Sequence, residues 1–242
     1  MRWFARMRDK LWAHRNPGKL PQLAPFENKI SSQFGEDGVI ERIFQTVPLR
    51  SSFFVEFGIG PNGADPDYKR GLEGNCVQLA RKGWSGVFMD AGEHPARFGV
   101  KNEFITPANV NEVFRRHKVP DDVDLVSIDV DGQDWWIWEA LEARPSVTVI
   151  EYNGHLGIDE SVSVPLDPEF RWDGSDYYGA SLLALCKLGE RKGYSLVFAN
   201  GVNAFFVQTA SLPNAVEFEY RGLYRPARNH HRDPLGRAFV TI

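Results

Sequence analysis

Short apolar runs that end in polar residues recur along the chain and predict the strands of a parallel sheet. These runs are residues 53–57 (FFVEF), 87–90 (VFMD), 124–129 (DLVSID) and 147–150 (VTVI). A parallel strand is buried on both faces, so its sequence is continuously apolar. Because polar residues gather at the carboxyl ends of these runs, we expect any shared site to lie at that edge of the sheet.

The segments between and after these runs have helical patterns, and the last strands form a hairpin. Residues 75–82 predict a helix that ends at Gly83, and residues 181–188 predict another before Gly193. The strand predicted at 194–198 is followed by Asn200-Gly201, a dipeptide typical of tight hairpins, and by a returning strand at 204–208. The predicted fold class is therefore α/β and Rossmann-like, mostly parallel, with a C-terminal antiparallel hairpin.

A glycine-rich turn follows the first predicted strand. Gly58 and Gly60 come directly after Glu56, and Gly63 follows. Glycine allows sharp turns and close approach to a ligand because it has no Cβ. Asp90 ends the next strand 34 positions after Glu56, a spacing that suits a carboxylate for a ribose diol; the alternative is that Asp90 only starts a turn. The turn lacks a full G-x-G-x-x-G, which together with the final hairpin favours S-adenosylmethionine over NAD.

Taken together, several motifs between residues 30 and 210 resemble the FkbM-type methyltransferases or a sister group within the class I superfamily. The motifs are residues 32–38 (SQFGEDG), 54–58 (FVEFG), 83–86 (GWSG), 127–132 (SIDVDG) and 177–182 (YYGASL). The resemblance implies a class I methyltransferase sheet and S-adenosylmethionine as cofactor. It also implies hydroxyl methylation, often of sugars or polyketide-type products, as in polysaccharide biosynthesis.

The same resemblance implies roles for individual residues. Glu56, Gly58 and Gly60 would line the methionine end of the cofactor, and Asp90 would hold the ribose hydroxyls. The chain departs from the family pattern at residues 61–74, a longer and more charged connection than usual.

The segment at residues 33–38 precedes a predicted helix and is expected to fold over the cofactor. Gln33, Glu36 or Asp37 would then reach its amino-acid end. The alternative is that these residues cap the helix.

Methyl transfer to a hydroxyl requires removal of a proton, by a general base or through a metal. Asp129 and Asp131 follow a predicted strand and His155 follows the next, so all three are catalytic candidates. A divalent cation such as Mg²⁺ is compatible with Asp129, Asp131 and Glu151, which are hard oxygen ligands. The alternative for the aspartates is a turn in which Asp131 or Asp134 caps the next helix.

Aromatic residues follow the same motif. For the helix containing Trp135, Trp136 and Trp138, we expect at least two of the three to lie in the core. Residues 172–178 form a loop with Gly and Asp and are the better candidate for a lid over a glycan acceptor.

Composition agrees with one enzyme domain. The chain has 242 residues, of which 43% are hydrophobic and 25% charged, enough for a substantial core. The net charge of −4 gives no reason to expect nucleic acid binding. Cys76 and Cys186 lack metal-ligand spacing and are expected to be reduced thiols in a cytoplasmic protein. No apolar run has the length needed to span a bilayer.

The two ends of the chain are basic and give three expected parts: residues 1–29, 30–210 and 211–242. Residues 1–19 have apolar positions at helical spacing and predict a basic amphipathic helix. Such a helix suits peripheral contact of residues 1–15 with the inner face of a membrane. The alternative, which is favoured, is packing on protein, either on its own domain or on a homo-oligomer partner. The tail contains His230 and His231 and is expected to pack loosely or bind an anionic substrate rather than a metal.

The sequence therefore predicts a cytoplasmic S-adenosylmethionine-dependent O-methyltransferase that acts on a hydroxyl of a small-molecule or glycan acceptor. Two alternatives stay open. One is a metal-dependent glycosyltransferase that uses Asp129-Val130-Asp131, and the other is a non-catalytic interaction module with the same fold.

Overall fold

The computed structural model of this chain describes residues 22–61, 63, 67–212, 220–227 and 230–242. The amphipathic helix expected within residues 1–19, with its proposed membrane contact at residues 1–15, lies outside the described residues.

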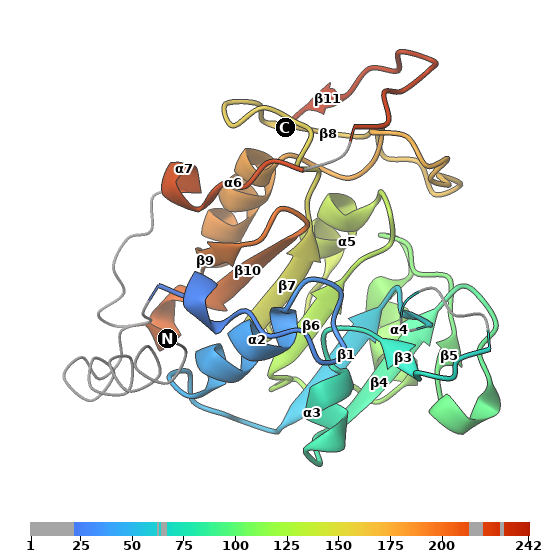
Figure 1. Cartoon of the computed structure of the whole chain (residues 1–242), viewed down its shortest axis with the longest axis vertical. Coiled ribbons are helices and arrows are strands. Elements are labelled where there is room, and N and C mark those ends of the chain that lie inside the picture. The colour runs from blue at the N-terminus through green and yellow to red at the C-terminus, as the bar shows by residue number, and fades with distance from the viewer. Residues whose placement is uncertain (1–21, 62, 64–66, 213–219, 228–229) are drawn as a thin grey trace.

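A seven-stranded sheet forms the centre of the molecule (Figure 1), with the strand order β5-β4-β1-β6-β7-β10-β9. Its strands are β1 (Phe53–Phe57), β4 (Ser85–Asp90), β5 (Lys101–Asn102), β6 (Leu125–Ile128), β7 (Val147–Glu151), β9 (Tyr194–Ala199) and β10 (Asn203–Gln208). Only β10 runs antiparallel to its neighbours β7 and β9. The predicted mostly parallel sheet with a final antiparallel hairpin is confirmed.

The strand order reverses direction at β1. The chain first builds outward through β4 and β5, then returns to the other side of β1 to add β6 and β7. At such a reversal the loops after adjacent strands diverge to opposite faces and leave a crevice at the carboxyl ends. The glycine turn after β1 therefore opens into the place where the sheet topology provides a binding site.

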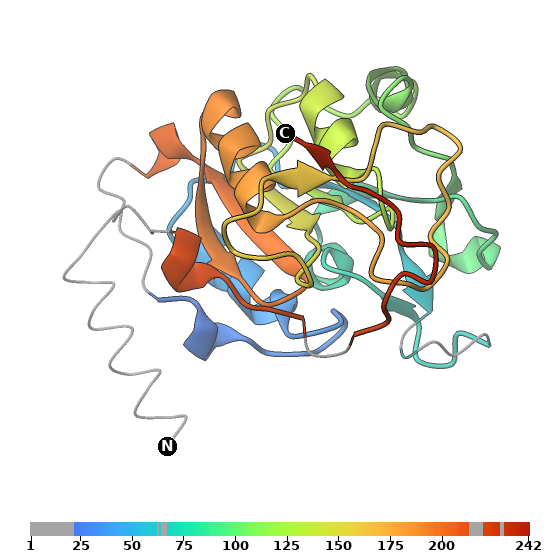
Figure 2. The same cartoon turned by 90° about the horizontal axis from the view of Figure 1, so that it is seen from above.

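Helices cover both faces of the sheet (Figure 2). The helices α2 (Glu36–Phe44) and α3 (Val77–Arg81) share one buried core with Phe54 of β1. On the other face, Val55 and Phe57 of the same strand share a core with three helices. These are α4 (Val110–Arg116), α5 (Asp134–Ala140) and α6 (Leu182–Lys192). Alternate residues of β1 thus enter opposite cores, which explains why the strand is continuously apolar.

Short elements complete the fold. They are the 3₁₀ turns η1 (Ala24–Phe26), η3 (Ala96–Phe98) and η4 (Thr209–Ser211), the helix α7 (Tyr220–Leu223), and the paired short strands β2 (Gly60–Pro61) with β3 (Leu72–Glu73) and β8 (Val162–Ser163) with β11 (Val240–Thr241). Among the described helices, none combines the length and apolarity that crossing a bilayer requires.

The tryptophans of α5 belong mainly to the core. Trp135 and Trp138 are buried, and the indole N–H of Trp135 donates to the carbonyl of Ala184 in α6 at 3.1 Å. Trp136 is half-buried. The prediction that at least two of the three are core residues is confirmed.

The C-terminal segment, here residues 220–227 and 230–242, lies over the carboxyl ends of the central strands. The Ala227 N–H donates to the Gly154 carbonyl at 2.8 Å, and the Tyr152 hydroxyl donates to the Arg225 carbonyl at 2.6 Å. Farther on, β11 pairs with β8 at the edge of this layer (Figure 1). These backbone-directed hydrogen bonds hold the described part of the tail specifically, in contrast with the loose packing expected from its basic composition.

Candidate functional site

A hollow of about 420 Å³ opens at the carboxyl ends of β1, β4 and β6. We call it the carboxyl-edge hollow. It is lined by Gly58, Ile59, Gly60, Pro61, Tyr68, Asp90, Gly92, Glu93, His94, Asp129 and Asp131. The glycine turn, the end of β4 and the Asp-x-Asp motif therefore meet in one place, as their positions at the strand ends predicted.

Gly58 joins the ends of three strands. Its N–H donates to the Met89 carbonyl of β4 at 3.1 Å, and a Cβ built on it would lie 1.5 Å from the Asp129 carbonyl oxygen after β6. Its φ of +74° also lies in the left-handed region. Only glycine fits here, because any side chain would collide with backbone.

Gly60 has a different environment. A Cβ built on it would meet no atom within 4 Å, so this position faces the open space of the hollow. The absence of a side chain at residue 60 therefore leaves room for a ligand rather than for the protein itself.

Asp90 ends β4 and is the centre of a short polar chain. Its Oδ1 accepts from the Gly92 N–H at 2.6 Å and lies 3.0 Å from His94 Nε2. His94 Nδ1 lies 2.7 Å from the Tyr68 hydroxyl. With Oδ1 engaged in these contacts, the chain fixes the orientation of the Asp90 carboxylate.

Tyr68 and His94 were not expected from the sequence. Tyr68 lies in the connection at residues 61–74, for which the sequence predicted no site residue. His94 lies four residues after Asp90 with Gly92 between them, a spacing that allows a turn to bring the two side chains together.

Below the hollow, three carboxylates converge. Asp129, Asp134 and Glu151, here called the acid trio, each offer one oxygen, and these oxygens lie within 4.8 Å of one another. Glu151 Oε2 is buried without a hydrogen-bond partner. Burial raises the pKa of Asp134 to about 7, and burial followed by the neighbouring aspartates raises the pKa of Glu151 well above its usual range. Three buried carboxylates this close together repel one another. The trio is therefore stabilised either by a bound cation or by protons that its carboxyl groups keep.

Asp131 is not a member of this trio, although the sequence pattern grouped it with Asp129 and Glu151. Its side chain is solvent-accessible and lines the hollow, and its backbone φ is +54°. There, partial desolvation by the surrounding walls and then the Asp90 charge raise the pKa of Asp131. Asp134 takes the inner position because it begins α5 and its carboxylate accepts from the Val130 and Gly132 N–H groups at 2.8 and 2.9 Å. Neither Asp131 nor Asp134 caps α5, whose N-cap is Gln133 without a side-chain cap hydrogen bond; the Asp134 carboxylate instead holds the turn that precedes the helix.

Glu56 does not line the hollow. It is 3% exposed and accepts from the N–H groups of Asn75 and Cys76 at 2.5 and 2.9 Å, next to the start of α3. Burial raises its pKa to about 7 against the effect of these hydrogen bonds. The structure thus places Glu56 behind the glycine turn, where its carboxylate holds the segment that leads into α3.

The start of α2 and the residues before it are also held by structural contacts. Glu36 is buried and accepts from the side-chain amides of Asn200 and Asn203 at 2.6 and 3.1 Å. Asp37 accepts from the N–H groups of Ser31 and Ser32, both at 2.9 Å. Gln33 is exposed. None of these three lines the hollow, and none caps α2, whose N-cap is Gly35 with no side-chain cap hydrogen bond. The contacts of Glu36 and Asp37 hold the helix start to the neighbouring segments instead.

His155 follows β7 but does not line the hollow. Its Nε2 lies 3.3 Å from Asp176 Oδ1. Burial lowers the pKa of His155, and the Asp176 carboxylate partly opposes this effect. His155 belongs to a separate cluster, described below.

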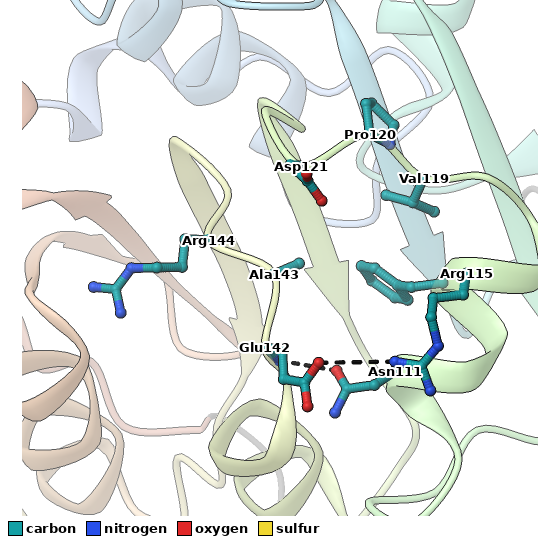
Figure 3. A pocket seen from close by; sticks show the side chains of 9 residues that line it. Asn111, Arg115, Val119, Pro120, Asp121, Glu142, Ala143 and Arg144 are labelled. Atoms are coloured by element: carbon teal, nitrogen blue, oxygen red, sulfur yellow. Dashed lines mark hydrogen bonds and ion pairs between the residues drawn. The ribbon is translucent and has the colours of Figure 1, made fainter.

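A second hollow, of about 350 Å³, lies at the opposite edge of the sheet (Figure 3). It is formed by the end of α4 and the segments that lead into β6 and β7, so it lies near the amino ends of these strands. Its polar contacts are an exposed Arg115–Glu142 pair at 3.8 Å and a hydrogen bond from the Glu142 N–H to Asn111 at 2.9 Å. It contains none of the predicted site residues.

Comparison with protein-family models, with curated proteins and with solved structures finds no significant match to this chain.

Proposed function

We propose that this protein is an S-adenosylmethionine-dependent O-methyltransferase. The observation that carries the proposal is the charge of the carboxyl-edge hollow. Its described lining includes Asp90, Glu93, Asp129 and Asp131 and contains neither Lys nor Arg. A nucleoside ligand that carries positive charge and no phosphate suits such a lining.

The same charge disfavours the competing nucleotides. NAD and nucleotide sugars carry a diphosphate, which proteins commonly bind with helix N-termini, basic side chains or a metal. Several carboxylates facing a diphosphate repel it, whereas the sulfonium and ammonium groups of S-adenosylmethionine are attracted to them. The antiparallel β10 between β7 and β9 is also the sheet ending implied by the resemblance to class I methyltransferases.

The lining residues fit separate parts of this cofactor. The Asp90 carboxylate, oriented by His94, is placed to accept hydrogen bonds from a ribose diol. Gly60 leaves space for the ligand to approach the backbone. Asp129 connects the hollow to the acid trio, which compensates the cationic end.

The chemistry required of the protein is then modest. The cofactor supplies a methyl group that is already activated, so the chain has to align an acceptor oxygen and remove its proton. Asp131 is the best-placed base among the predicted candidates, because it is exposed and lines the hollow. His155 lies outside the hollow lining, and we assign it no role in this step.

A sugar-type acceptor suits the surface next to Asp131. The Phe170 ring packs where a Cβ of Gly132 would lie, 2.3 Å from the built position. From the same loop, Trp172 is 47% exposed and its ring contacts Tyr178 at a centroid distance of 5.8 Å. The loop that brings Phe170 against Gly132 thus also carries an exposed aromatic face, Trp172, which is suited to stacking on a sugar ring.

A glycosyltransferase that uses Asp129-Val130-Asp131 is less well supported. That reading requires both aspartates to hold one metal-diphosphate, but Asp129 groups with Asp134 and Glu151 while Asp131 does not. The acid trio itself fits a divalent cation with hard oxygen ligands, so Mg²⁺ is compatible with a methyltransferase as well.

Calorimetric titration with S-adenosylhomocysteine tests the proposal, with NAD and with UDP-glucose plus Mn²⁺ as controls. We expect selective binding of S-adenosylhomocysteine at micromolar concentration. Preferred binding of UDP-glucose would support the glycosyltransferase instead. A folded protein that binds none of the three would support the non-catalytic interaction module.

A further inference from the structure

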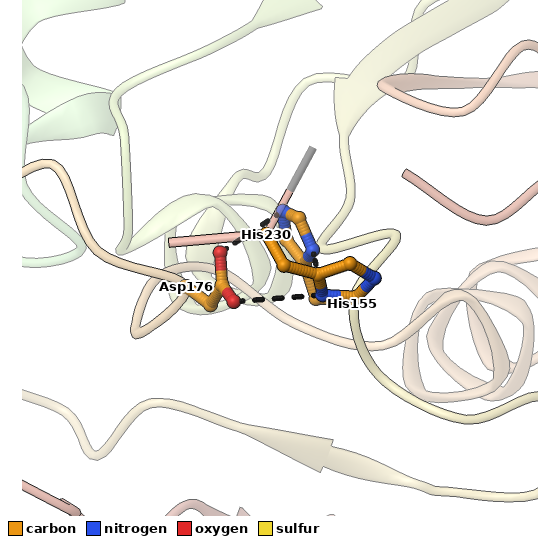
Figure 4. A group of neighbouring side chains, drawn as sticks. All are labelled: His155, Asp176 and His230. Atoms are coloured by element: carbon orange, nitrogen blue, oxygen red, sulfur yellow. Dashed lines mark hydrogen bonds and ion pairs between the residues drawn. The ribbon is translucent and has the colours of Figure 1, made fainter. Parts of the chain in front are cut away.

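His155, Asp176 and His230 meet outside the carboxyl-edge hollow and form what we call the histidine cluster (Figure 4). His155 Nε2 lies 3.3 Å from Asp176 Oδ1, and His155 Nδ1 lies 3.2 Å from His230 Nδ1. His230 Nδ1 lies 3.7 Å from Asp176 Oδ2. One donor atom from each residue can be chosen so that all three lie within 4.8 Å of one another.

The three residues come from distant parts of the sequence, and hydrogen bonds independent of any ligand bring them together. Asp176 and His231 are tied twice, by the Asp176 N–H to the His231 carbonyl and by the His231 N–H to Asp176 Oδ1, both at 2.7 Å. The Asn153 side chain accepts from the His155 N–H at 3.0 Å and donates to the Asp176 carbonyl at 2.8 Å. The backbone that presents the donors is therefore already in place.

The exposure of the cluster is uneven. The side chains of His155 and Asp176 are 12% and 18% exposed, whereas that of His230 is 69% exposed. His155 and Asp176 are thus largely buried in the protein surface, whereas His230 approaches them from the C-terminal segment and remains accessible to solvent.

We propose that the histidine cluster is a binding site for a divalent transition-metal ion of the zinc type. Imidazole nitrogens suit Zn²⁺, Co²⁺ and Ni²⁺, and two imidazoles with one carboxylate form a common donor set for such ions. Zinc binds nitrogen and oxygen at about 2.0 to 2.2 Å, which puts its ligands about 3 to 4 Å apart. The 3.7 Å contact between His230 Nδ1 and Asp176 Oδ2 falls in this range, and a set of one donor atom from each of the three residues has all its separations within 4.8 Å.

The bound ion would have three protein ligands and an open position for water, and it would fasten the C-terminal segment to the loops after β7 and before α6. The site is separate from the acid trio, whose ligands are all carboxylates and suit harder cations. The proposal rests on none of the steps of methyl transfer.

Binding of Zn²⁺ and Co²⁺ to the chelator-treated full chain tests the proposal, with calorimetry for Zn²⁺ and visible absorption for Co²⁺. We expect one ion per chain and a Co²⁺ spectrum typical of low coordination number. His230→Ala should weaken binding at least about tenfold, since even loss of a residue supporting a ligand commonly costs that much. Because the His230 side chain is largely exposed, this variant should stay folded.

His231→Ala is the matched control. It removes the neighbouring imidazole but keeps the backbone bonds to Asp176, so metal affinity should be unchanged. Asp176→Asn keeps an acceptor for the His231 N–H and should weaken binding as His230→Ala does.

Two results would overturn the proposal. One is wild-type protein that binds no more Zn²⁺ than the His155→Ala, His230→Ala double variant, which would leave the cluster as a hydrogen-bonded chain from Asp176 through His155 to His230. The other is equal loss of affinity in His230→Ala and His231→Ala, which would indicate adventitious binding by the tail.

Discussion

At the scale of single residues, the two glycines after β1 have opposite reasons to lack a side chain. Gly58 is enclosed by backbone, whereas Gly60 faces open space. Both glycines belong to one sequence motif, but Gly58 is required for close packing of the backbone and Gly60 leaves space in the hollow. Their substitution therefore separates stability from binding.

We predict that Gly58→Ala lowers the free energy of unfolding by more than about 2 kcal/mol, because a left-handed φ and a backbone collision coincide there. Gly60→Ala should leave stability within about 1 kcal/mol but weaken S-adenosylhomocysteine binding at least about tenfold. Urea denaturation and calorimetry measure the two effects. Unchanged affinity in Gly60→Ala would mean that the ligand does not approach this turn.

Asp90 offers a second prediction at this scale. Asp90→Asn keeps an acceptor for the Gly92 N–H but removes the charge, and we expect S-adenosylhomocysteine affinity to fall about 10- to 100-fold. Glu93→Gln is the control, since it removes an equal charge from the same lining. An equal loss in both variants would show a general charge effect and refute a specific ribose contact.

At the scale of elements, the acid trio is brought together by β6, β7 and the start of α5. This arrangement lowers the stability of the folded protein when the carboxyl groups are ionised. The folded-state pKa of Asp134 is about 7 against an ordinary 3.8, with desolvation as the main cause. The folded state therefore binds its proton more tightly than the unfolded state. This contribution to stability is complete below about pH 4 and is lost as the pH rises through about 7.

We predict that the ligand-free protein loses about 3 kcal/mol of stability between pH 4.5 and pH 8 for each of the buried carboxyls Asp134 and Glu56. Asp129→Asn removes one charge from the trio, so it should stabilise the protein by about 1 to 3 kcal/mol at pH 8 and little at pH 4.5. Urea denaturation across this range measures both effects. A wild-type stability that rises toward pH 8 would contradict the predicted burden.

A bound cation should offset the destabilisation that the ionised acid trio causes. Addition of Mg²⁺ or S-adenosylhomocysteine at pH 8 should raise the melting temperature of the wild type more than that of Asp129→Asn. Equal shifts in both proteins would place the binding site elsewhere.

At the scale of the whole molecule, the C-terminal segment returns to cover the site edge of the sheet. Arg237 joins it to the aromatic loop, here residues 170–178, through Asp173 at 2.5 Å and by lying 4.2 Å over the Tyr177 ring. Asp233, in the same segment as Arg237, pairs with it at 3.0 Å. Hydrogen bonding to Arg237 lowers the pKa of Asp233 to about 2, so this pair, which holds the Arg237 side chain within the segment, is present above about pH 4 and weakens as the pH falls toward 2.

We predict that Arg237→Ala exposes the C-terminal segment, giving several-fold faster cleavage there by a protease at neutral pH. Arg232→Ala, in the same segment and with no ion pair among the described residues, is the matched control and should be cleaved as the wild type is. Equal cleavage of all three proteins would show that Arg237 does not secure the tail.

Much of the architecture followed from local pattern. Continuous apolar runs predict buried parallel strands, Asn200-Gly201 predicts the final hairpin, and the α5 tryptophans fit a core, all of which the structure has. The positions of Gly58, Asp90, Asp129 and Asp131 at one edge also followed, because parallel strands end on the same side.

What the sequence could not determine was the direction in which each polar side chain points. Glu56 lies in the most informative motif yet turns toward α3, and Asp134 rather than Asp131 joins Asp129 and Glu151. The meeting of His155, Asp176 and His230 depended on the return of a tail 75 residues after His155. Strand order and buried runs are fixed by hydrophobic patterning within short segments. Side-chain convergence depends on loop paths and desolvation across the whole molecule, which only the tertiary structure decided.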